Sequence, residues 1–263
     1  MKHCLDSFPV PLIRLKETDS TLRYLNMLCE QDNQDNHHIQ EFTTVISDFQ
    51  TAGKGQQGNS WESERGKNLL FSFVLYPDFL EVRKQFLLSQ LISVSIKEEL
   101  EAQHAEGFSI KWPNDIYWKD KKICGILIEN NLIGSKIERS IAGIGININQ
   151  KKFYSSAPNP VSLIQIMENQ REIEILLLLA SIIKRCMYYY GFFRQGDTDT
   201  VTERYRLSLY RRDGFYPYKD KDGTFTARIL RVKPEGALVL MDETGKEREY
   251  TFKEVGYLDL PTS

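Results

Sequence analysis

Residues 143–149 read Gly-Ile-Gly-Ile-Asn-Ile-Asn, and this strict alternation predicts a β-strand with two different faces. Successive side chains of a strand point to opposite sides, so the isoleucines share one face while the glycines and asparagines share the other. The isoleucine face is expected to pack against the core. Glycine within a strand lowers stability, so the opposite face needs a reason, such as the close approach of a ligand or of another backbone. A helix packed closely against the glycines is the alternative explanation.

Residues 122–129 read Lys-Ile-Cys-Gly-Ile-Leu-Ile-Glu and predict a second strand, which extends the bare face through Gly125. Regular alternation places Lys122 and Gly125 on opposite sides, so a ligand that touches both needs a bend near the start of this strand. Cys124 falls on the isoleucine side and is expected to be a small buried hydrophobe.

The preceding segment, residues 111–116, reads Lys-Trp-Pro-Asn-Asp-Ile and is expected to lie in the partner strand of a hairpin. Proline fixes the chain beside two polar residues, which favours Asn114 and Asp115 aimed outward at a strand end rather than buried. An ordinary turn is the commoner use of an Asn-Asp pair, so this segment alone leaves both interpretations open.

Residues 49–61 read Phe-Gln-Thr-Ala-Gly-Lys-Gly-Gln-Gln-Gly-Asn-Ser-Trp and have neither a helical nor a strand period. Three glycines within six residues allow several backbone N–H groups to point into one concavity, which suits an anion, and Lys54 adds a positive charge. The segment is not a P-loop, because no Gly-Lys-Ser/Thr sequence opens a helix here. A flexible surface loop is an equally good explanation of the segment by itself.

Apolar periodicity and turn residues predict the remaining elements. Strands are expected at residues 12–15, 42–49, 69–75, 109–118, 122–129 and 139–149, helices after residues 19–21 and over 82–105, 171–193 and 199–210, and loops at 31–40 and 151–161. After residue 212, short strands separated by glycine turns predict a small barrel. We therefore divide the chain into domains of residues 1–212 and 213–263.

The composition is that of an ordinary globular protein, with 41% hydrophobic residues and a net charge of −2 over 263 residues. This balance argues against a nucleic-acid-binding surface and against a polybasic membrane anchor. The most apolar run, residues 173–183, is shorter than the roughly 20 residues that a membrane span needs. Four widely spaced cysteines argue against a zinc knuckle or a disulfide framework. We expect a soluble cytoplasmic protein.

Taken together and in this order, the four quoted segments resemble the biotin protein ligases. Members of that family carry a Gly-Arg-Gly-Arg-Arg-Gly loop ending in Trp, then Lys-Trp-Pro-Asn-Asp, Lys-x-x-Gly-Ile-Leu-x-Glu and Gly-x-Gly-Ile-Asn-x-Asn. The resemblance implies an α+β fold, a mixed sheet flanked by helices as in class II tRNA synthetases, with a small SH3-like β-barrel at the C-terminus. It also implies a ligase that uses ATP and Mg²⁺ to convert biotin to biotinyl-5′-AMP. The biotin then passes to a lysine in the biotin-acceptor domain of a carboxylase.

The resemblance assigns roles to individual residues. Lys122 is the leading catalytic residue, because a held ammonium offsets charge at the reacting α-phosphate, and Asp115 is the candidate for orienting or deprotonating the incoming lysine. The residues expected to bind biotin are Ser20, Thr21, Gln50, Gly53, Lys54, Gly55, Gln56, Lys122 and Gly125. Those expected to bind the adenylate are Lys54, Gln56, Trp61, Lys111, Asn114, Gly143, Gly145 and Asn147. The ligands of Mg²⁺ are not assigned.

The chain departs from the family pattern at several positions. Where the family has arginines in the glycine loop, this chain has Lys54, Gln56, Gln57 and Asn59. Lysine lacks the bidentate fork of arginine and glutamine has no charge, so we expect a looser hold on the adenylate phosphate. Leu22 stands where the family often has Asn. The arginine expected near the adenylate has no clear counterpart in residues 257–263.

Two other functions stay open on the sequence. A lipoate or octanoate protein ligase would share the fold and the adenylate chemistry, although the Lys-Trp-Pro-Asn-Asp segment and the glycine loop count against it. A non-catalytic biotin-sensing protein is the other alternative. Some relatives carry an N-terminal helix-turn-helix of about 60 residues, for which the position of the Asp-Ser-Thr motif at 19–21 leaves no room. We therefore expect no DNA binding, and a homodimer stays open.

Overall fold

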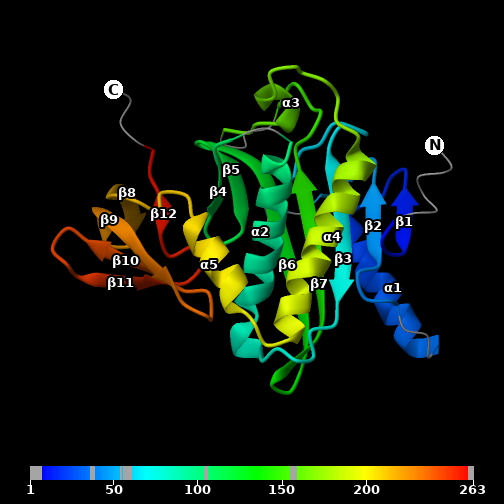
Figure 1. Ribbon diagram of the computed structural model, residues 1–263, viewed down its shortest axis with the longest axis horizontal. Coiled ribbons are helices and arrows are strands. Elements are labelled where there is room, and N and C mark those ends of the chain that lie inside the picture. The colour runs from blue at the N-terminus through cyan, green and yellow to red at the C-terminus, as the bar shows by residue number, and fades with distance from the viewer. Residues whose placement is uncertain are drawn as a thin grey trace.

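The computed structural model describes residues 8–35, 39–53, 55, 61–103, 106–154 and 159–259. Its main body is a seven-stranded mixed sheet with the strand order β1-β2-β3-β7-β6-β5-β4 (Figure 1). The strands are β1 (Leu12–Leu15), β2 (Thr44–Ser47), β3 (Leu69–Leu75), β4 (Phe108–Lys111), β5 (Asp115–Trp118), β6 (Lys121–Ile133) and β7 (Lys136–Ile146). β1 and β2 pair in parallel, and the other neighbours pair antiparallel. The expected α+β class, a mixed sheet flanked by helices, is confirmed.

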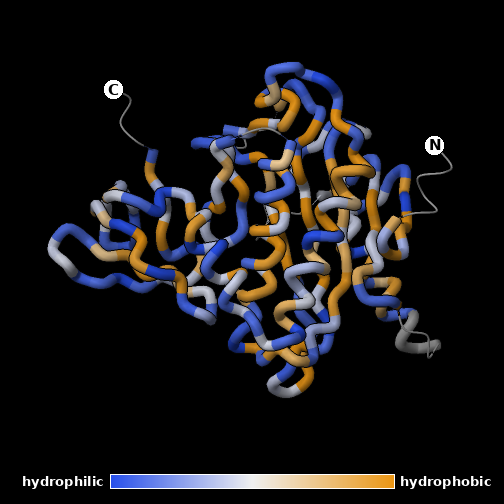
Figure 2. Tube along the Cα trace, in the orientation of Figure 1, coloured by the Kyte–Doolittle hydropathy of each residue, from blue (hydrophilic) through white to orange (hydrophobic). Residues whose placement is uncertain are grey.

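Helices cover both faces of this sheet. They are α1 (Thr21–Asp35), α2 (Phe86–Glu101), α3 (Leu163–Ile166), α4 (Ile175–Arg194) and α5 (Asp199–Leu207). α2 and α4 lie over one face (Figure 1), where Phe71 and Phe73 of β3 join the same core as Ile144 of β7. α1 lies against the other face, where Val74 packs with Leu25. Because both faces of β3 are covered, this strand is hydrophobic along its whole length. Figure 2 shows hydrophobic residues gathered along the central strands, with hydrophilic loops at the rim.

A second, five-stranded antiparallel sheet follows at the C-terminal end, with the order β11-β10-β9-β8-β12 (Figure 1, left). Its strands are β8 (Tyr216–Asp220), β9 (Gly223–Val232), β10 (Leu238–Asp242), β11 (Glu247–Tyr250) and β12 (Gly256–Tyr257). Trp112 joins it to the main body, since its indole N–H donates to the carbonyl of Gly236 at 2.9 Å. The second sheet is consistent with a small β domain, and the boundary after residue 212 stays a prediction.

Several predicted element boundaries are wrong. Residues 31–35 continue α1 instead of opening a loop. The helix expected over 82–105 is shorter, since a 3-10 turn at Val82–Lys84 precedes α2. The single strand expected over 109–118 is two strands, because residues 112–114 turn the chain between β4 and β5.

Helix α4 is long and apolar enough to cross a membrane by length and composition, with a mean hydropathy of 1.3. In the fold it packs against α2 and the sheet, and Leu179, Ile182 and Cys186 are completely buried. Its Arg185 pairs with two carboxylates of α2. We therefore interpret α4 as a core helix.

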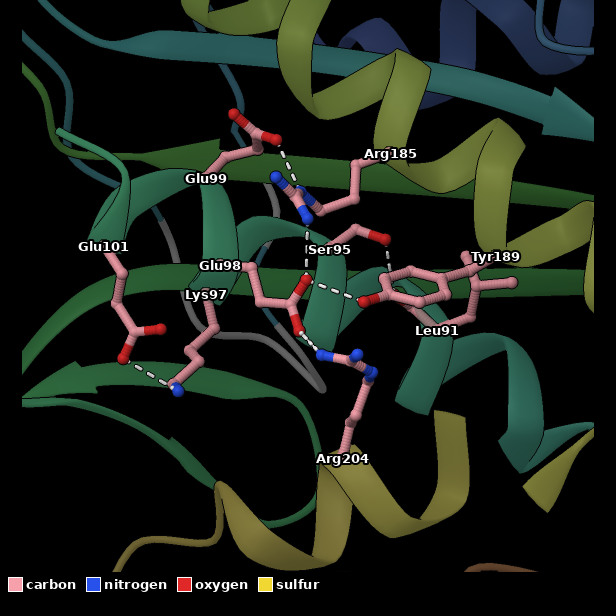
Figure 3. A network of polar contacts seen from close by, with 9 residues as sticks. All are labelled: Leu91, Ser95, Lys97, Glu98, Glu99, Glu101, Arg185, Tyr189 and Arg204. Atoms are coloured by element: carbon pink, nitrogen blue, oxygen red, sulfur yellow. Dashed lines mark hydrogen bonds and ion pairs between the residues drawn. The ribbon is translucent and has the colours of Figure 1, made fainter. Parts of the chain in front are cut away.

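Figure 3 shows the polar network that ties α2 to α4 and α5. Glu98 accepts hydrogen bonds from Arg185 and Arg204, each at 2.8 Å, and from the hydroxyl of Tyr189 at 2.7 Å. Glu99 accepts from Arg185 at 2.5 Å. The side chains of Glu98 and Glu99 are only 17% and 10% exposed, so their charges depend on these partners.

We expect Arg185→Met to lower the free energy of unfolding by about 2–3 kcal/mol, because it leaves the Glu99 carboxylate buried without its cation. Urea denaturation followed by circular dichroism measures the change. Arg206→Met is the matched control, since its partner Glu203 is 54% exposed and such surface pairs contribute less than about 1 kcal/mol. Equal losses in the two variants would contradict a stabilising role for the buried network.

Candidate active site

A β-bulge at the start of β6 determines where Lys122 points. The pairing of β5 with β6 shifts by one residue there, so that Ile123 is the extra residue in β6. The shift brings Lys122 to the same face as Gly125, where an added Cβ would lie 3.5 Å from the lysine ammonium. Cys124 is completely buried, as expected. The bend that a ligand touching both Lys122 and Gly125 requires is therefore confirmed.

We use the name glycine floor for the surface formed by Gly125, Gly143 and Gly145. Gly125 and Gly145 lie directly opposite each other in the ladder of β6 and β7. A Cβ at Gly145 would lie 2.5 Å from the Trp61 indole, and one at Gly143 would lie 2.8 Å from Leu22 of α1. The groups that approach these glycines in the fold are side chains, whereas the sequence predicted a ligand or another backbone. The alternative explanation, a closely packed helix, also holds at Gly143.

A cavity of about 340 Å³ lies over the glycine floor. The N-terminus of α1 lines one part of it and the C-terminal sheet another. The expected site residues that line it are Ser20, Thr21, Gln50, Gly55, Trp61, Lys111, Asn114, Asp115, Lys122, Gly125, Gly143 and Gly145. The fold thus brings most of the residues expected from the sequence into one cavity.

The part of the cavity beside α1 carries neutral hydrogen-bonding groups. The side-chain oxygen of Gln50 accepts hydrogen bonds from the Thr21 backbone N–H at 2.7 Å and from the Thr21 hydroxyl at 3.1 Å. This fixes the amide of Gln50, so its NH₂ is the group that it can offer to a ligand. Ser20 is only 3% exposed and lines the same part of the cavity. Such neutral groups suit an uncharged polar ring.

Lys122 and Asp115 form an ion pair beside the glycine floor. The lysine Nζ lies 2.7 Å from Oδ2 of Asp115, and the two side chains are 31% and 27% exposed. Backbone hydrogen bonds hold the lysine in place: its N–H donates to Asn159 at 2.9 Å, and its carbonyl accepts from Val161 at 3.0 Å. A ligand in the cavity can therefore meet both a cation and a carboxylate.

Lys111 lies near the C-terminal sheet and is packed among aromatic rings. Its Nζ donates to the Tyr117 hydroxyl at 3.1 Å and lies 5.0 Å from the ring centre of Tyr257. Burial lowers the pKa of Lys111, because desolvation disfavours its charged form. Within the described part of the chain, no carboxylate lies within ion-pair distance of it. An anionic group of a ligand would supply the missing counter-charge.

Some predicted site residues lie differently than expected. The prediction that Asn114 stays unburied is wrong: its amide donates to the carbonyl of Ile126 on β6, which holds it in the interior. Asn147 does not line the cavity. Its amide N–H donates to Val161 at 3.1 Å, while its buried side-chain oxygen has no hydrogen-bond partner among the described residues.

The glycine loop is described in part. A hydrogen bond joins the two ends of this loop: the carbonyl of Gly53 accepts from the backbone N–H of Trp61 at 3.0 Å. The expected site residues Lys54 and Gln56 lie outside the described residues. Over the described ranges, no three His, Cys, Asp or Glu side chains gather as metal ligands.

The sequence did not single out the contribution of the C-terminal sheet to the cavity. Phe252, Lys253, Val255 and Tyr257 line it. No motif or period marks these residues, because they lie in and after a turn that the long-range packing of Trp112 against Phe252 brings to the cavity. The family pattern predicts an arginine within residues 257–263, whereas the basic residue from this part of the chain that lines the cavity is Lys253.

Comparisons with known proteins identify relatives of this chain. Residues 15–147, about half of the chain, match the Biotin/lipoate A/B protein ligase family. The chain is 30% identical to the Bifunctional ligase/repressor BirA of Bacillus spizizenii over 225 residues, which are 82% of this chain. It is 27% identical to the Bifunctional ligase/repressor BirA of Escherichia coli over 177 residues, 66% of this chain.

A solved biotin protein ligase from Aquifex aeolicus, in complex with biotin and ATP, has a similar structure. The TM-score is 0.75 at 27% sequence identity, covering 94% of this chain and 97% of that one. The two BirA proteins are longer, and the matched chain spans 66% and 48% of their lengths. The family match over residues 15–147, together with the fold, shows that this chain belongs to the biotin/lipoate A/B protein ligase family.

Proposed function

We propose that this protein is an ATP-dependent biotin protein ligase, which forms biotinyl-5′-AMP and transfers biotin to a lysine of a carboxylase's biotin-acceptor domain. The observation that carries the proposal is the set of groups that line one cavity. It combines neutral hydrogen-bonding groups beside α1, the glycine floor, and the Lys122–Asp115 pair. A ligand with a neutral polar ring at one end and a reacting carboxylate at the other fits this order of groups.

In the first step, a carboxylate oxygen of biotin attacks the α-phosphorus of ATP. The bond from this phosphorus to the bridging oxygen breaks, and pyrophosphate leaves with the electron pair. Charge grows on the α-phosphate oxygens in the transition state, and the ammonium of Lys122 is placed to offset it. The ion pair with Asp115, at 2.7 Å, holds this ammonium beside the floor before ATP binds.

In the second step, the amine of the acceptor lysine attacks the acyl carbon of the mixed anhydride, and AMP leaves. The amine must lose its proton to react, and Asp115 is the carboxylate lining the cavity that can orient the ammonium and accept the proton. Trp61 covers Gly145 and so restricts the access of water to the anhydride.

Mg²⁺ enters this proposal as part of the substrate. Asp115 is engaged by Lys122, and the described residues offer no cluster of carboxylates at the cavity. Mg²⁺ characteristically binds substrate phosphates and keeps several waters. We therefore expect Mg²⁺ to enter the cavity bound to the phosphates of ATP.

Isothermal titration with biotin and with lipoate tests the substrate. We expect biotin to bind and lipoate to bind at least about 100-fold more weakly, because a site with hydrogen-bonding groups for the ureido ring leaves them unpaired with lipoate. Tighter binding of lipoate would contradict the proposal in favour of a lipoate ligase. A non-catalytic sensor would bind biotin without releasing pyrophosphate from ATP.

We also propose a cytoplasmic location and no specific DNA binding. The net charge of −2 gives little electrostatic affinity for DNA. The widely spaced cysteines fit a reducing compartment, and Cys124 and Cys186 are buried without a disulfide bond.

A further inference from the structure

The start of β6 has a neighbour other than β7. β7 ends at Ile146, whose partner in β6 is Cys124, so residues before Cys124 have no partner in β7. Lys122 pairs there with Pro160 instead, in an isolated parallel bridge shortly before α3 (Figure 1). We use the name support segment for residues 159–161. The support segment thus takes the place of β7 beside the start of β6.

The support segment holds both backbone groups of Lys122. The N–H of Lys122 donates to the carbonyl of Asn159 at 2.9 Å, and the carbonyl of Lys122 accepts from the N–H of Val161 at 3.0 Å. The N–H and the carbonyl of one strand residue point to the same side, so Lys122 and its β5 partner Tyr117 form a non-hydrogen-bonded pair. The backbone position of Lys122 therefore depends on the support segment.

Residues that follow β7 hold the support segment itself in place. The side-chain amide of Asn147 donates to the carbonyl of Val161 at 3.1 Å, and its backbone N–H donates to Ile123, the bulged residue of β6, at 2.9 Å. Ser162 is completely buried, and its hydroxyl donates to the carbonyl of Gln150 at 2.5 Å. Breaking such buried hydrogen bonds costs free energy. The support segment is therefore a firm attachment for Lys122.

Asn159 begins the support segment in an unusual backbone conformation. Its φ is +49°, in the left-handed region, which asparagine adopts more readily than most side-chain-bearing residues. It also precedes Pro160, and a residue before proline ordinarily has an extended backbone. The Asn159 side chain is exposed, so the contribution of this residue is the direction of its carbonyl. An unfavourable conformation retained beside a candidate catalytic residue indicates a functional position.

We propose that Asn159 is a positioning residue for Lys122: its left-handed backbone directs the carbonyl that binds the Lys122 N–H, and so places the ammonium beside the glycine floor. The inference rests on the proposed function, in which this ammonium offsets charge at the α-phosphate. Such stabilisation is effective when the charge is in place before the reaction. No residue of the support segment lines the cavity, so Asn159 acts through Lys122.

The test compares Asn159→Val with Asn159→Gly. A β-branched residue is an outlier at positive φ, so valine should turn the carbonyl away from Lys122, whereas glycine adopts this conformation freely. We expect kcat for biotin-dependent pyrophosphate release to fall roughly five- to thirtyfold with valine, because small displacements of catalytic groups have large effects on rate. Glycine should keep kcat within about twofold of wild type. Biotin affinity, measured by isothermal titration, should change less than about threefold in either variant, since the support segment does not line the cavity.

A double-mutant cycle separates positioning from a role in folding. In the Lys122→Ala background, Asn159→Val should lower the rate by less than about twofold, because the ammonium that Asn159 positions is absent. Asn159→Ala introduces less strain than valine and should lose a smaller factor, which should also be absent in the Lys122→Ala background. This variant serves if the valine variant does not fold.

Gln170→Val is the matched control. Gln170 also has a positive φ, of +44°, and is exposed, but it does not line the cavity. It should keep the wild-type rate even if it melts earlier. A wild-type rate in Asn159→Val, an equal loss in the Lys122→Ala background, or an equal loss in Gln170→Val would each overturn the positioning role. If wild type itself releases no pyrophosphate with biotin, the proposed function is wrong and the role of Asn159 falls with it.

Discussion

Replacing Lys122 by alanine is expected to lower biotin-dependent pyrophosphate release by about 10²–10³-fold, the usual loss when one donor that stabilises transition-state charge is removed. The ammonium lies beside the glycine floor, 2.7 Å from Asp115, and the bulge at Ile123 turns it to the cavity side of β6. The variant should keep its fold, because the Lys122 side chain is 31% exposed and the backbone bonds to Asn159 and Val161 remain.

Lys121→Ala is the control for this experiment. Its side chain neighbours Lys122 in sequence but is exposed and does not line the cavity. It should retain wild-type activity. Pyrophosphate release by Lys122→Ala within about threefold of wild type would remove Lys122 from the catalytic role, since so small a change corresponds to less than one kcal/mol of transition-state stabilisation.

Replacing Gly145 by valine is expected to weaken the binding of a non-hydrolysable ATP analogue roughly ten- to hundredfold, because overpacking a close contact typically costs about 1–3 kcal/mol. A Cβ at this position would lie 2.5 Å from the Trp61 indole, so the ring must leave the glycine floor. Isothermal titration measures the affinity, and thermal melting checks the fold.

Gly191→Ala is the control for Gly145→Val. Gly191 lies in α4, and an added Cβ would meet nothing within 4 Å. This variant should bind the analogue as wild type does and melt no earlier, since alanine favours helix over glycine. An unchanged affinity in Gly145→Val would show that the position of Trp61 on the floor is not needed for ATP binding.

The sequence predicted the sheet better than the local geometry of the site. The strand Leu69–Leu75 and the alternation over 143–146 follow directly from side-chain periodicity. The strand predicted over 139–149 ends earlier, at Ile146, and residues 147–149 are all buried. The sequence showed that a ligand touching both Lys122 and Gly125 needs a bend near the start of β6. It did not give the position of the bulge at Ile123, because the bulge arises from the pairing with β5. The split of 109–118 into two strands was missed, because strand periodicity persists on both sides of the turn. The short helix α3 was also missed, although Ser162 and Gln165 form the capping box that marks its start.

Contacts between distant segments limited the prediction of the site. Gln50 holds Thr21 through two hydrogen bonds across 29 positions, and no local pattern indicates this pairing. Asn114 is buried because Ile126, on the neighbouring strand, offers a carbonyl to its amide. Lys253 reaches the cavity because Phe252 packs against Trp112, more than a hundred residues earlier in the chain. Such placements follow from tertiary packing and leave no signature in the sequence around each residue.

The mass of an acceptor domain tests the central claim most directly. The 263-residue protein is incubated with ATP, Mg²⁺, biotin and a purified biotin-acceptor domain, and the mass of the domain is then measured by intact-mass spectrometry. We expect a gain of one biotinyl group that requires ATP and is absent when the acceptor lysine is replaced by arginine. An acceptor domain that stays unmodified with biotin, but gains a lipoyl or octanoyl group when that acid is supplied to a lipoyl domain, would contradict the account.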